Sequence, residues 1–393
     1  MTDTSEIYLD NAASTEPYPE VIEAVAATMR ETYGNPSSPH QKGAAAKAML
    51  EASRQTVADA LGALPEEVFF TSGGTEANNL AITGACLAHK DQKGQIITSS
   101  LEHPSVTKTI RGLKRDGWDA SYIDVQRGRL DLEQMARAVQ ASTILISMMY
   151  VQNELGYIYP LNEIVGIRDH RAERALLHID AVQAFGKLDV RPHALGAELL
   201  SISAHKIGGP KGIGALFASA GTKMFTTAFG GGQERGLRSG TEALPLIVGF
   251  AKAVEITMAN RETLGRQVAL LNLRLRELLQ AEFKAVQINS RTDGSPYILN
   301  FTLPGLDNKK ALGLLSQMGI YVGTAAACES NRHTVPEGQW RDKHPLVLEL
   351  AGYPKKDTRS TFRVSFFANN HPEDADALVG GLKAAAEGLG VAL

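Results

Sequence analysis

Leu199-Leu-Ser-Ile-Ser-Ala-His-Lys206 is an apolar stretch of strand length that ends in a histidine and a lysine. Similar apolar runs precede it at VFFTS (from Val68), ILISMMY (from Ile144) and LLHID (ending at Asp180). Helical periodicity lies between several of these runs, for example around Glu163 to Glu173. Buried strands that alternate with helices predict an α/β fold with a mostly parallel sheet and helices on both of its faces.

The last third of the chain shows a different pattern. Apolar residues recur at steps of three and four from Leu264 to Leu278, which predicts a long helix that begins shortly after Asn260. The strand candidates YILNFTL, GIYVG and TFRVSFF follow, and a closing helix is expected from Pro372. This pattern predicts a second, smaller α+β domain.

The length of 393 residues accommodates two domains with substantial cores. We expect residues 16–260 to form the large domain, and residues 1–15 with 261–393 to form the small one. Two packed domains make their interface the expected place for a small-molecule site.

The composition excludes several classes of protein. Hydrophobic residues make up 44% and charged residues 21%, which excludes a disordered or fibrous chain. A net charge of -3 gives no basic field for direct nucleic-acid binding. The 10 histidines and 2 cysteines show no metal-ligand spacing and no disulfide framework. We find no apolar run long enough to cross a membrane and no signal peptide in MTDTSEIYLD, so we expect a cytoplasmic protein.

Two strand ends carry reactive side chains. Lys206 follows its apolar strand directly and precedes a flexible Gly-Gly-Pro turn. On its own it could be an ordinary exposed lysine, or a Schiff-base lysine that needs positioning and partial desolvation. Asp180, in His178-Ile-Asp180-Ala-Val-Gln183, likewise ends a strand, where a capping or turn role is also open.

A third element is Thr71-Ser-Gly-Gly-Thr75-Glu-Ala-Asn, a glycine-containing passage from strand to helix. Glycines let the backbone approach a phosphate, and the N–H groups of a helix N-terminus can bind it. Taken alone, this motif could be no more than a tight turn. Together, an anion cradle, a strand-end carboxylate and a strand-end amine are what pyridoxal phosphate requires of a protein.

Motifs spread over nearly the whole chain resemble those of one family. The chain is similar to the class V aminotransferase family of fold-type I pyridoxal-phosphate enzymes, and within it to the cysteine desulfurases of the NifS/IscS type. The resemblance runs from Ile7 to Arg363. Its motifs are Tyr33-Gly-Asn-Pro36-Ser, Thr71-Ser-Gly-Gly-Thr-Glu76, Glu102-His103-Pro, Asn153-Glu-Leu-Gly156, His178-Ile-Asp180-Ala-Val-Gln183, Ser203-Ala-His-Lys206 and Gly230-Gly-Gly-Gln-Glu-Arg-Gly-Leu-Arg-Ser-Gly-Thr241.

The resemblance implies a role for each matching residue around the cofactor, pyridoxal 5'-phosphate. Lys206 would form the Schiff base, and Asp180 would hold the pyridinium nitrogen protonated so that the ring acts as an electron sink. His103 would stack on the ring and act as acid or base; a buried structural histidine is the alternative. The remaining cofactor contacts would be Gln183 and Asn153 at the phenolic oxygen, and Gly74, Thr75, Ser203 and His205 at the phosphate.

Two further roles concern the substrate and a neighbouring subunit. Arg363 would clamp the substrate carboxylate, for which a planar guanidinium suits better than an ammonium, and Asn35 would assist it. Thr241 would reach the phosphate of the neighbouring subunit, which implies a homodimer.

The resemblance places a persulfide-forming cysteine at Cys328, in Gly323-Thr-Ala-Ala-Ala-Cys328-Glu. A small buried residue is the alternative for this position, and that reading suits Cys86, on an apolar helix face, well. The surroundings of Cys328 depart from the family's serine-rich pattern, and Asn331 to His344 forms a longer, charged connection. Gln233 and Gln152 also differ from the usual residues of their motifs.

The expected function is that of an L-cysteine desulfurase, a sulfurtransferase that converts L-cysteine to L-alanine. Its sulfur would pass as a persulfide on Cys328 to an acceptor protein, for iron–sulfur clusters or other sulfur-containing molecules. Two alternatives remain at this point. One is selenocysteine lyase or another amino-acid lyase of a specialised pathway on the same cofactor. The other is a binding scaffold that has lost activity, which intact Lys206, Asp180 and Arg363 oppose.

Overall fold

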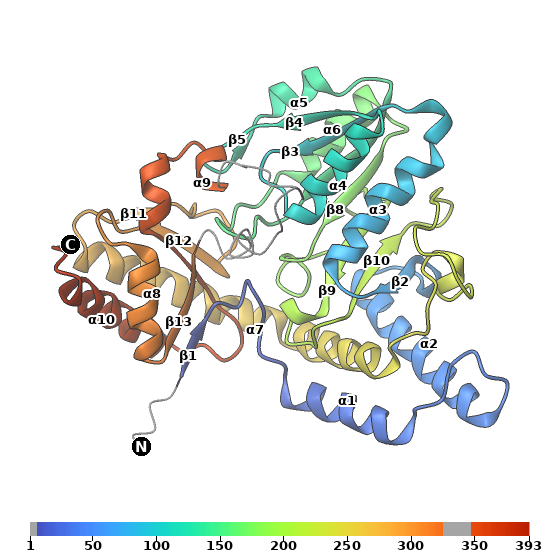
Figure 1. Ribbon diagram of the computed structural model, residues 1–393, viewed down its shortest axis with the longest axis horizontal. Coiled ribbons are helices and arrows are strands. Elements are labelled where there is room, and N and C mark those ends of the chain that lie inside the picture. Colours follow the sequence, from blue (N-terminus) through green and yellow to red (C-terminus); the bar gives the residue numbers. More distant parts are fainter. Residues whose placement is uncertain (1–5, 325–346, 393) are drawn as a thin grey trace, which may run out of the picture.

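The computed structural model describes residues 6–324 and 347–392, and it contains two separate main sheets (Figure 1). The larger sheet has seven strands in the order β2-β10-β9-β8-β7-β3-β4. Neighbouring strands from β9 to β4 run parallel, whereas β10 runs antiparallel to both of its neighbours. The strands are β2 (Val68–Thr71), β3 (Gln95–Ser99), β4 (Asp119–Ile123), β7 (Thr143–Met149), β8 (Leu176–Asp180), β9 (Leu199–Ser203) and β10 (Gly214–Ala218).

Both faces of this sheet are covered, as the apolar runs of the sequence predict. Leu199 faces a core that α3 and α4 complete, and the next residue, Leu200, faces the opposite core beneath α2 and α7. Leu145 and Ile146 of β7 alternate in the same way. The helices of this part are α1 (Pro19–Glu31), α2 (Gln41–Leu61), α3 (Gly74–Ala88), α4 (Pro104–Arg115), α5 (Leu132–Ala138) and α6 (Leu161–Arg171), with a small ribbon of β5 (Val125–Gln126) and β6 (Arg129–Leu130).

The second sheet has five strands in the order β1-β13-β14-β12-β11. Its apolar side chains form a core of their own with the C-terminal half of α7 and with α8 and α10. The elements are β1 (Ile7–Leu9), β11 (Gln287–Ile288), β12 (Ile298–Thr302), β13 (Ile320–Thr324), β14 (Thr361–Ser365), α8 (Asn308–Gln317) and α10 (Pro372–Gly388). The short helix α9 (Val347–Leu350) instead places Leu348 in the core of the large sheet. The closing helix begins at Pro372, as predicted from the sequence.

The long helix begins much earlier than the sequence pattern predicts. Helix α7 spans Leu244–Glu282, 39 residues, and runs from one core to the other (Figure 1). Asn260 is therefore not its N-cap, which corrects the prediction: its side chain donates to the carbonyl of Ile256 one turn back. One side of the helix between Leu244 and Thr257 is buried against the core of the large sheet, and this packing extends the helix across the expected boundary at residue 260. The division into domains at that residue stays a prediction.

The segment that follows β1 connects the small sheet to the large one. The backbone N–H of Ala12 donates to Oγ of Ser365 on β14 over 2.8 Å. Three residues later, the N–H of Thr15 donates to the carbonyl of His205, just beyond β9. Residues 10–15 therefore lie between the two sheets and become part of the wall of the pocket described next.

Candidate active site

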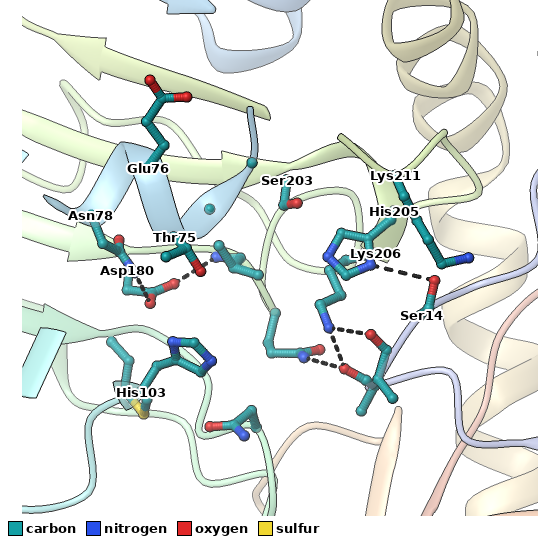
Figure 2. A pocket seen from close by; sticks show the side chains of 18 of the residues that line it. Ser14, Thr75, Glu76, Asn78, His103, Asp180, Ser203, His205, Lys206 and Lys211 are labelled. Carbon is teal, nitrogen blue, oxygen red and sulfur yellow. Dashed lines mark hydrogen bonds between the residues drawn. The ribbon is translucent and has the colours of Figure 1, made fainter. Parts of the chain in front are cut away.

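The carboxyl ends of β7, β8 and β9 open onto a pocket of about 490 Å³ between the two sheets. Ligands of open parallel sheets bind at such strand ends. Most of the residues that the sequence predicts for the site line this pocket (Figure 2). They are Gly74, Thr75, His103, Asn153, Asp180, Gln183, Ser203, His205, Lys206 and Arg363.

The passage from β2 into α3 forms an anion cradle at one end of the pocket. Gly73 has φ +144°, a conformation that favours glycine, and Gly74 begins the helix with no room for a side chain: a Cβ there would lie 2.6 Å from Cγ2 of Val182. Ser203 lies beside Gly73, and its buried hydroxyl has no partner among the described residues. An unpaired hydroxyl next to a helix N-terminus fits a phosphate group.

Lys206 lies in a short 3-10 turn, Ala204–Lys206, that continues directly from β9. Its Nζ donates to the carbonyls of Ala12 and Ala13, over 2.6 and 2.7 Å, so the amine is held at the pocket wall (Figure 2). Next to it, burial lowers the pKa of His205 to about 3, and the charge of Lys206 adds to the shift. His205 is therefore neutral at physiological pH.

Asp180, 5% exposed, ends β8 and receives two hydrogen bonds. The N–H of Val182 donates to Oδ1 over 3.0 Å, and Nδ2 of Asn78 donates to Oδ2 over 2.7 Å (Figure 2). Asn78 also donates to Oγ of Ser105 over 2.8 Å. Neither Asn78 nor Ser105 was predicted from the sequence, although Asn78 stands one helical turn after Gly74 in the Thr71–Asn78 motif.

His103 caps α4 from the opposite side of the pocket. Its Nδ1 accepts from the backbone N–H of Ser105 over 3.2 Å and lies 2.7 Å from the hydroxyl of the same residue. Burial lowers the pKa of His103, as do Lys206 and Lys108, whereas Asp180 opposes the shift. In the preceding residue, burial raises the pKa of the Glu102 carboxyl to about 8, with the charge of Asp180 adding.

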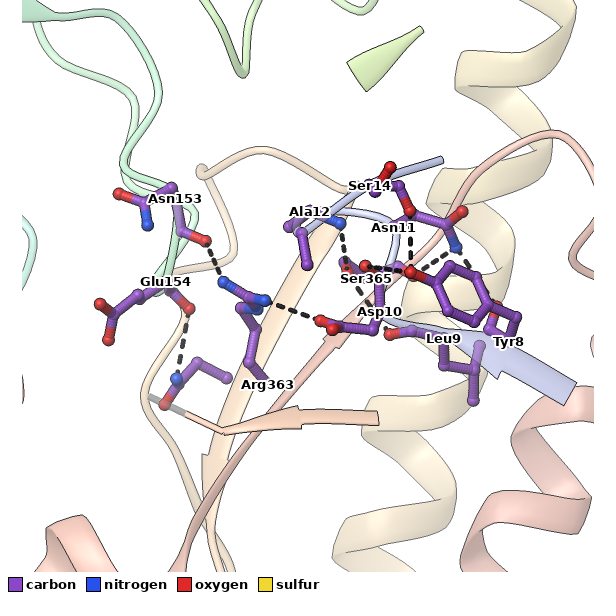
Figure 3. A network of polar contacts seen from close by, with 12 residues as sticks. Tyr8, Leu9, Asp10, Asn11, Ala12, Ser14, Asn153, Glu154, Arg363 and Ser365 are labelled. Atoms are coloured by element: carbon purple, nitrogen blue, oxygen red, sulfur yellow. Dashed lines mark hydrogen bonds and ion pairs between the residues drawn. The ribbon is translucent and has the colours of Figure 1, made fainter. Parts of the chain in front are cut away.

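Arg363 enters the pocket from β14 of the small sheet and is 2% exposed. Its Nη2 forms an ion pair with Oδ1 of Asp10 over 2.7 Å, and Nη1 donates to the carbonyl of Asn153 over 3.2 Å (Figure 3). Its Nε is buried and has no acceptor within residues 6–324 and 347–392. A guanidinium has five N–H donors, so Arg363 keeps donors beyond these two contacts, which fits a substrate carboxylate. Asp10 was not foreseen from the sequence.

Gln183 links the pocket to a second lysine. Its Nε2 donates to the carbonyl of Ala12 over 2.8 Å, and its Oε1 accepts from Nζ of Lys187 over 3.2 Å. Burial lowers the pKa of Lys187 to about 7, and Lys206 adds to the shift. Lys187 comes four residues after Gln183, the spacing of one helical turn, and this spacing could have indicated the contact from the sequence.

Two predicted residues are not brought into this pocket. Asn35 is exposed, and its side chain accepts from the backbone N–H of Ser37. Thr241 is also exposed and does not line the pocket of its own chain. Cys328 lies outside the described residues. The second cysteine, Cys86, is buried in α3, where burial raises its pKa to about 12, so the prediction that it is a small buried residue is confirmed.

No helix in the described part of the chain combines the length and apolarity needed to cross a bilayer. Residues 6–324 and 347–392 also contain no group of three or more His, Cys, Asp or Glu side chains placed to hold a metal ion.

This pocket is typical of an enzyme that uses a phosphorylated carbonyl cofactor on an amino acid. It combines an amine at one wall, a hydrogen-bonded carboxylate, an anion cradle and a buried arginine. The comparison with known families makes this specific. A family model described as "Aminotransferase class-V" matches residues 7–378. The chain belongs to this family, whose members depend on pyridoxal 5'-phosphate. The unpaired Ser203 hydroxyl and the Gly73–Gly74 cradle fit the phosphate of that cofactor.

Known relatives extend over nearly the whole chain. Cysteine desulfurase IscS of Methanosarcina thermophila is 37% identical over 96% of this chain and 91% of its own. A solved structure of a NifS-like protein superposes with a TM-score of 0.89, at 33% identity, and covers 98% of this chain and 99% of that one. The structure of SspA in complex with cysteine gives a TM-score of 0.79 at 31% identity and covers 92% of this chain and 98% of that one.

Proposed function

We propose that this protein is a cysteine desulfurase that depends on pyridoxal 5'-phosphate and converts L-cysteine to L-alanine. The observation that carries the proposal is the meeting of Lys206, Asp180 and Arg363 in one pocket. Curated relatives named as cysteine desulfurases support it, and so does SspA, a structural neighbour that holds cysteine. These relatives do not favour the alternative of a selenocysteine lyase or another lyase.

The pocket supplies a place for each part of the cofactor. The cradle at Gly73 and Gly74 and the hydroxyl of Ser203 would bind the phosphate, Asp180 would bind the ring nitrogen, and Lys206 would bind the cofactor covalently through its amine. When bound, the cofactor stores the electron pair released at the substrate Cα. Asn78 and the N–H of Val182 keep the Asp180 carboxylate oriented for this contact.

The substrate would be held by its carboxylate. Arg363 offers a buried guanidinium whose Nε has no acceptor in the described part of the chain. Lys206 lines the same pocket as Arg363, and once its amine is released from the cofactor, Nζ takes the Cα proton. Arg363 is 2% exposed, and the low dielectric constant around a buried group strengthens its ionic contact with the carboxylate.

Sulfur transfer is assigned to Cys328, as the sequence predicts. The Cys328 thiolate attacks the substrate sulfur, so that a new S–S bond forms while the bond from that sulfur to the substrate Cβ breaks. The electron pair of the broken bond stays with the substrate Cβ, which takes a proton and becomes the methyl group, and Nζ of Lys206 returns the proton to Cα to give L-alanine. The persulfide left on Cys328 passes its outer sulfur to an acceptor protein, such as a scaffold for iron–sulfur clusters or another sulfur carrier, in the cytoplasm.

We further propose a homodimer in which Thr241 reaches the phosphate site of the neighbouring subunit. Thr241 is exposed on a segment that also carries Phe229, whose side chain is 87% exposed. A bridge between Ala228 and Arg238 brings these two parts of the segment together. A large exposed aromatic side chain on the same segment as Thr241 supports a subunit interface at this segment.

The test is alanine and sulfide formation from L-cysteine with a thiol reductant, for the wild type, Cys328→Ala and Cys86→Ala. We expect alanine from the wild type, loss of alanine formation in Cys328→Ala, and no change in Cys86→Ala, because that thiol is buried in α3. Unchanged alanine formation in Cys328→Ala would contradict the assigned sulfur transfer. A cofactor-loaded wild type that forms no alanine would contradict the cysteine substrate.

A further inference from the structure

A chain of hydrogen bonds connects Asp180 to His103 across the floor of the pocket. Nδ2 of Asn78 donates to Oδ2 of Asp180 over 2.7 Å and to Oγ of Ser105 over 2.8 Å. Oγ of Ser105 lies 2.7 Å from Nδ1 of His103. Asn78 and Ser105 are 1% and 7% exposed, so these contacts are shielded from water.

The direction of each hydrogen bond follows from the Asp180 carboxylate, which only accepts. A flipped Asn78 amide would bring Oδ1 against the carboxylate oxygen, so Nδ2 must face Asp180. The far atom of the amide, Oδ1, is buried without a partner in the described part of the chain, and therefore does not compete for the opposite orientation. The second hydrogen of Nδ2 points to Ser105.

Ser105 thus accepts from Asn78, and its own hydroxyl hydrogen is available for His103. The backbone N–H of Ser105 also points at the same ring nitrogen, Nδ1, over 3.2 Å. A backbone N–H cannot turn away or become an acceptor. Two donors therefore converge on Nδ1, and a proton on that nitrogen would collide with the fixed backbone donor.

We propose that Asn78 and Ser105 are positioning residues that hold His103 in the tautomer protonated at Nε2. In a neutral imidazole, the nitrogen that accepts hydrogen bonds carries no proton, so the other nitrogen is the protonated one. His103 lines the pocket, so its ring presents an N–H to a ligand there as a hydrogen-bond donor (Figure 2). The sequence left open whether His103 acts as an acid or a base, and this tautomer favours a role as a proton or hydrogen-bond donor through Nε2.

The charged groups around His103 are consistent with a neutral ring. Lys206, from the turn after β9, and Lys108, on α4 itself, oppose a positive charge on the imidazole, and burial acts in the same direction. Asp180 on β8 favours a positive charge, but part of its hydrogen-bonding capacity is used by Asn78 and Val182.

The test is ¹⁵N NMR of the histidine side chains in the cofactor-loaded protein, with His103→Gln used to assign the resonances. We expect Nε2 to resonate as a protonated nitrogen and Nδ1 as an unprotonated one at neutral pH. Ser105→Ala removes one of the two donors, so the pKa of His103 should rise by about one unit. Ser105→Thr, which keeps the hydroxyl, should restore the wild-type titration.

Ser53→Ala is the matched control, because Ser53 is a buried helix serine whose hydroxyl donates to the carbonyl of Met49. It should leave the His103 resonances unchanged. Asn78→Ala should shift them in the same direction as Ser105→Ala. A wild-type ring protonated at Nδ1, or resonances that do not respond to Ser105→Ala, would overturn the proposal. The NMR result does not depend on which amino acid the enzyme processes, so it is separable from the test of the proposed function.

Discussion

Oδ1 of Asp10 lies 2.7 Å from Nη2 of Arg363, and this ion pair joins the end of β1 to the middle of β14. The arginine side chain is 3% exposed and the aspartate side chain 22% exposed. The residue expected to bind the substrate carboxylate therefore already holds a carboxylate of the protein. The substrate must share the guanidinium with Asp10 or displace it.

Asp10→Asn should strengthen the binding of the substrate carboxylate by Arg363. The variant leaves the buried guanidinium without its counter-charge, so we expect the KM for L-cysteine to fall about threefold or more. We also expect a lower melting temperature that added substrate raises more than in the wild type. Steady-state kinetics and thermal melts measure both effects.

Asp376→Asn is the matched control for this prediction, because Asp376 pairs with Arg274 on the surface at 2.6 Å, with both side chains about half exposed. It should change neither quantity. An increased KM in Asp10→Asn would show instead that Asp10 is needed to orient Arg363.

Lys206→Ala should abolish covalent attachment of the cofactor. No other residue at the end of β9 places an amine against Ala12 and Ala13, so we expect turnover to fall by about a thousandfold or more. The absorbance of the lysine-bound cofactor should also disappear. Lys211→Ala, in the wall of the same pocket, should keep this absorbance. If Lys206→Ala kept the absorbance and Lys211→Ala lost it, the assignment would be wrong.

Gly74→Ala should damage the anion cradle. Its Cβ would lie 2.6 Å from Cγ2 of Val182, so the start of α3 must shift, at a cost of about 1–3 kcal/mol in unfolding free energy. Cofactor affinity should decrease with it. Gly112→Ala is the control: this glycine lies inside α4 with nothing within 4 Å of an added Cβ, and the change should stabilise by about 0.5–1 kcal/mol. Urea unfolding and cofactor titration measure these effects, and equal behaviour of the two variants would refute the steric argument.

Lys187→Met should change how stability depends on pH. Burial lowers the pKa of Lys187 from 10.5 to about 7, so between these values the unfolded chain binds a proton that the folded chain does not. Stability therefore rises with pH across this window, and the full penalty of the charged lysine is present below about pH 7. The variant lacks this penalty, so its advantage over the wild type should be largest near pH 7 and shrink toward pH 10.

Urea unfolding of both proteins at several pH values between these limits measures the difference. Lys252→Met, at an exposed lysine that pairs with Glu255, is the control and should follow the wild-type curve. Parallel curves for Lys187→Met and the wild type would contradict a depressed pKa for Lys187.

The sequence predicts the reactive ends of β8 and β9 well because their signals are local. Asp180 ends one largely apolar run and Lys206 comes three residues after another, and polar residues at such places are expected at the carboxyl ends of the strands. The same reasoning fails for the start of α7. Asn260 has the sequence signature of a cap, but the packing of residues 244–257 against the large sheet continues the helix through it.

The connections between distant segments could not be predicted in the same way. Asn78 and Ser105 are 27 residues apart and meet because α3 packs against α4. Asp10 and Arg363 are 353 residues apart and meet because β1 and β14 both neighbour β13. The resemblance to a family assigns roles to single residues, whereas the partners that orient them emerge from tertiary packing.

Residues 10–15, which accept the hydrogen bonds of Lys206, set an order of assembly during biosynthesis. Ala12 and Ala13 are translated long before Ser365 on β14, to which their segment is hydrogen-bonded. This wall of the pocket therefore cannot form on a nascent chain until β14 has been translated. A prematurely terminated product that lacks β14 would carry Lys206 without this support.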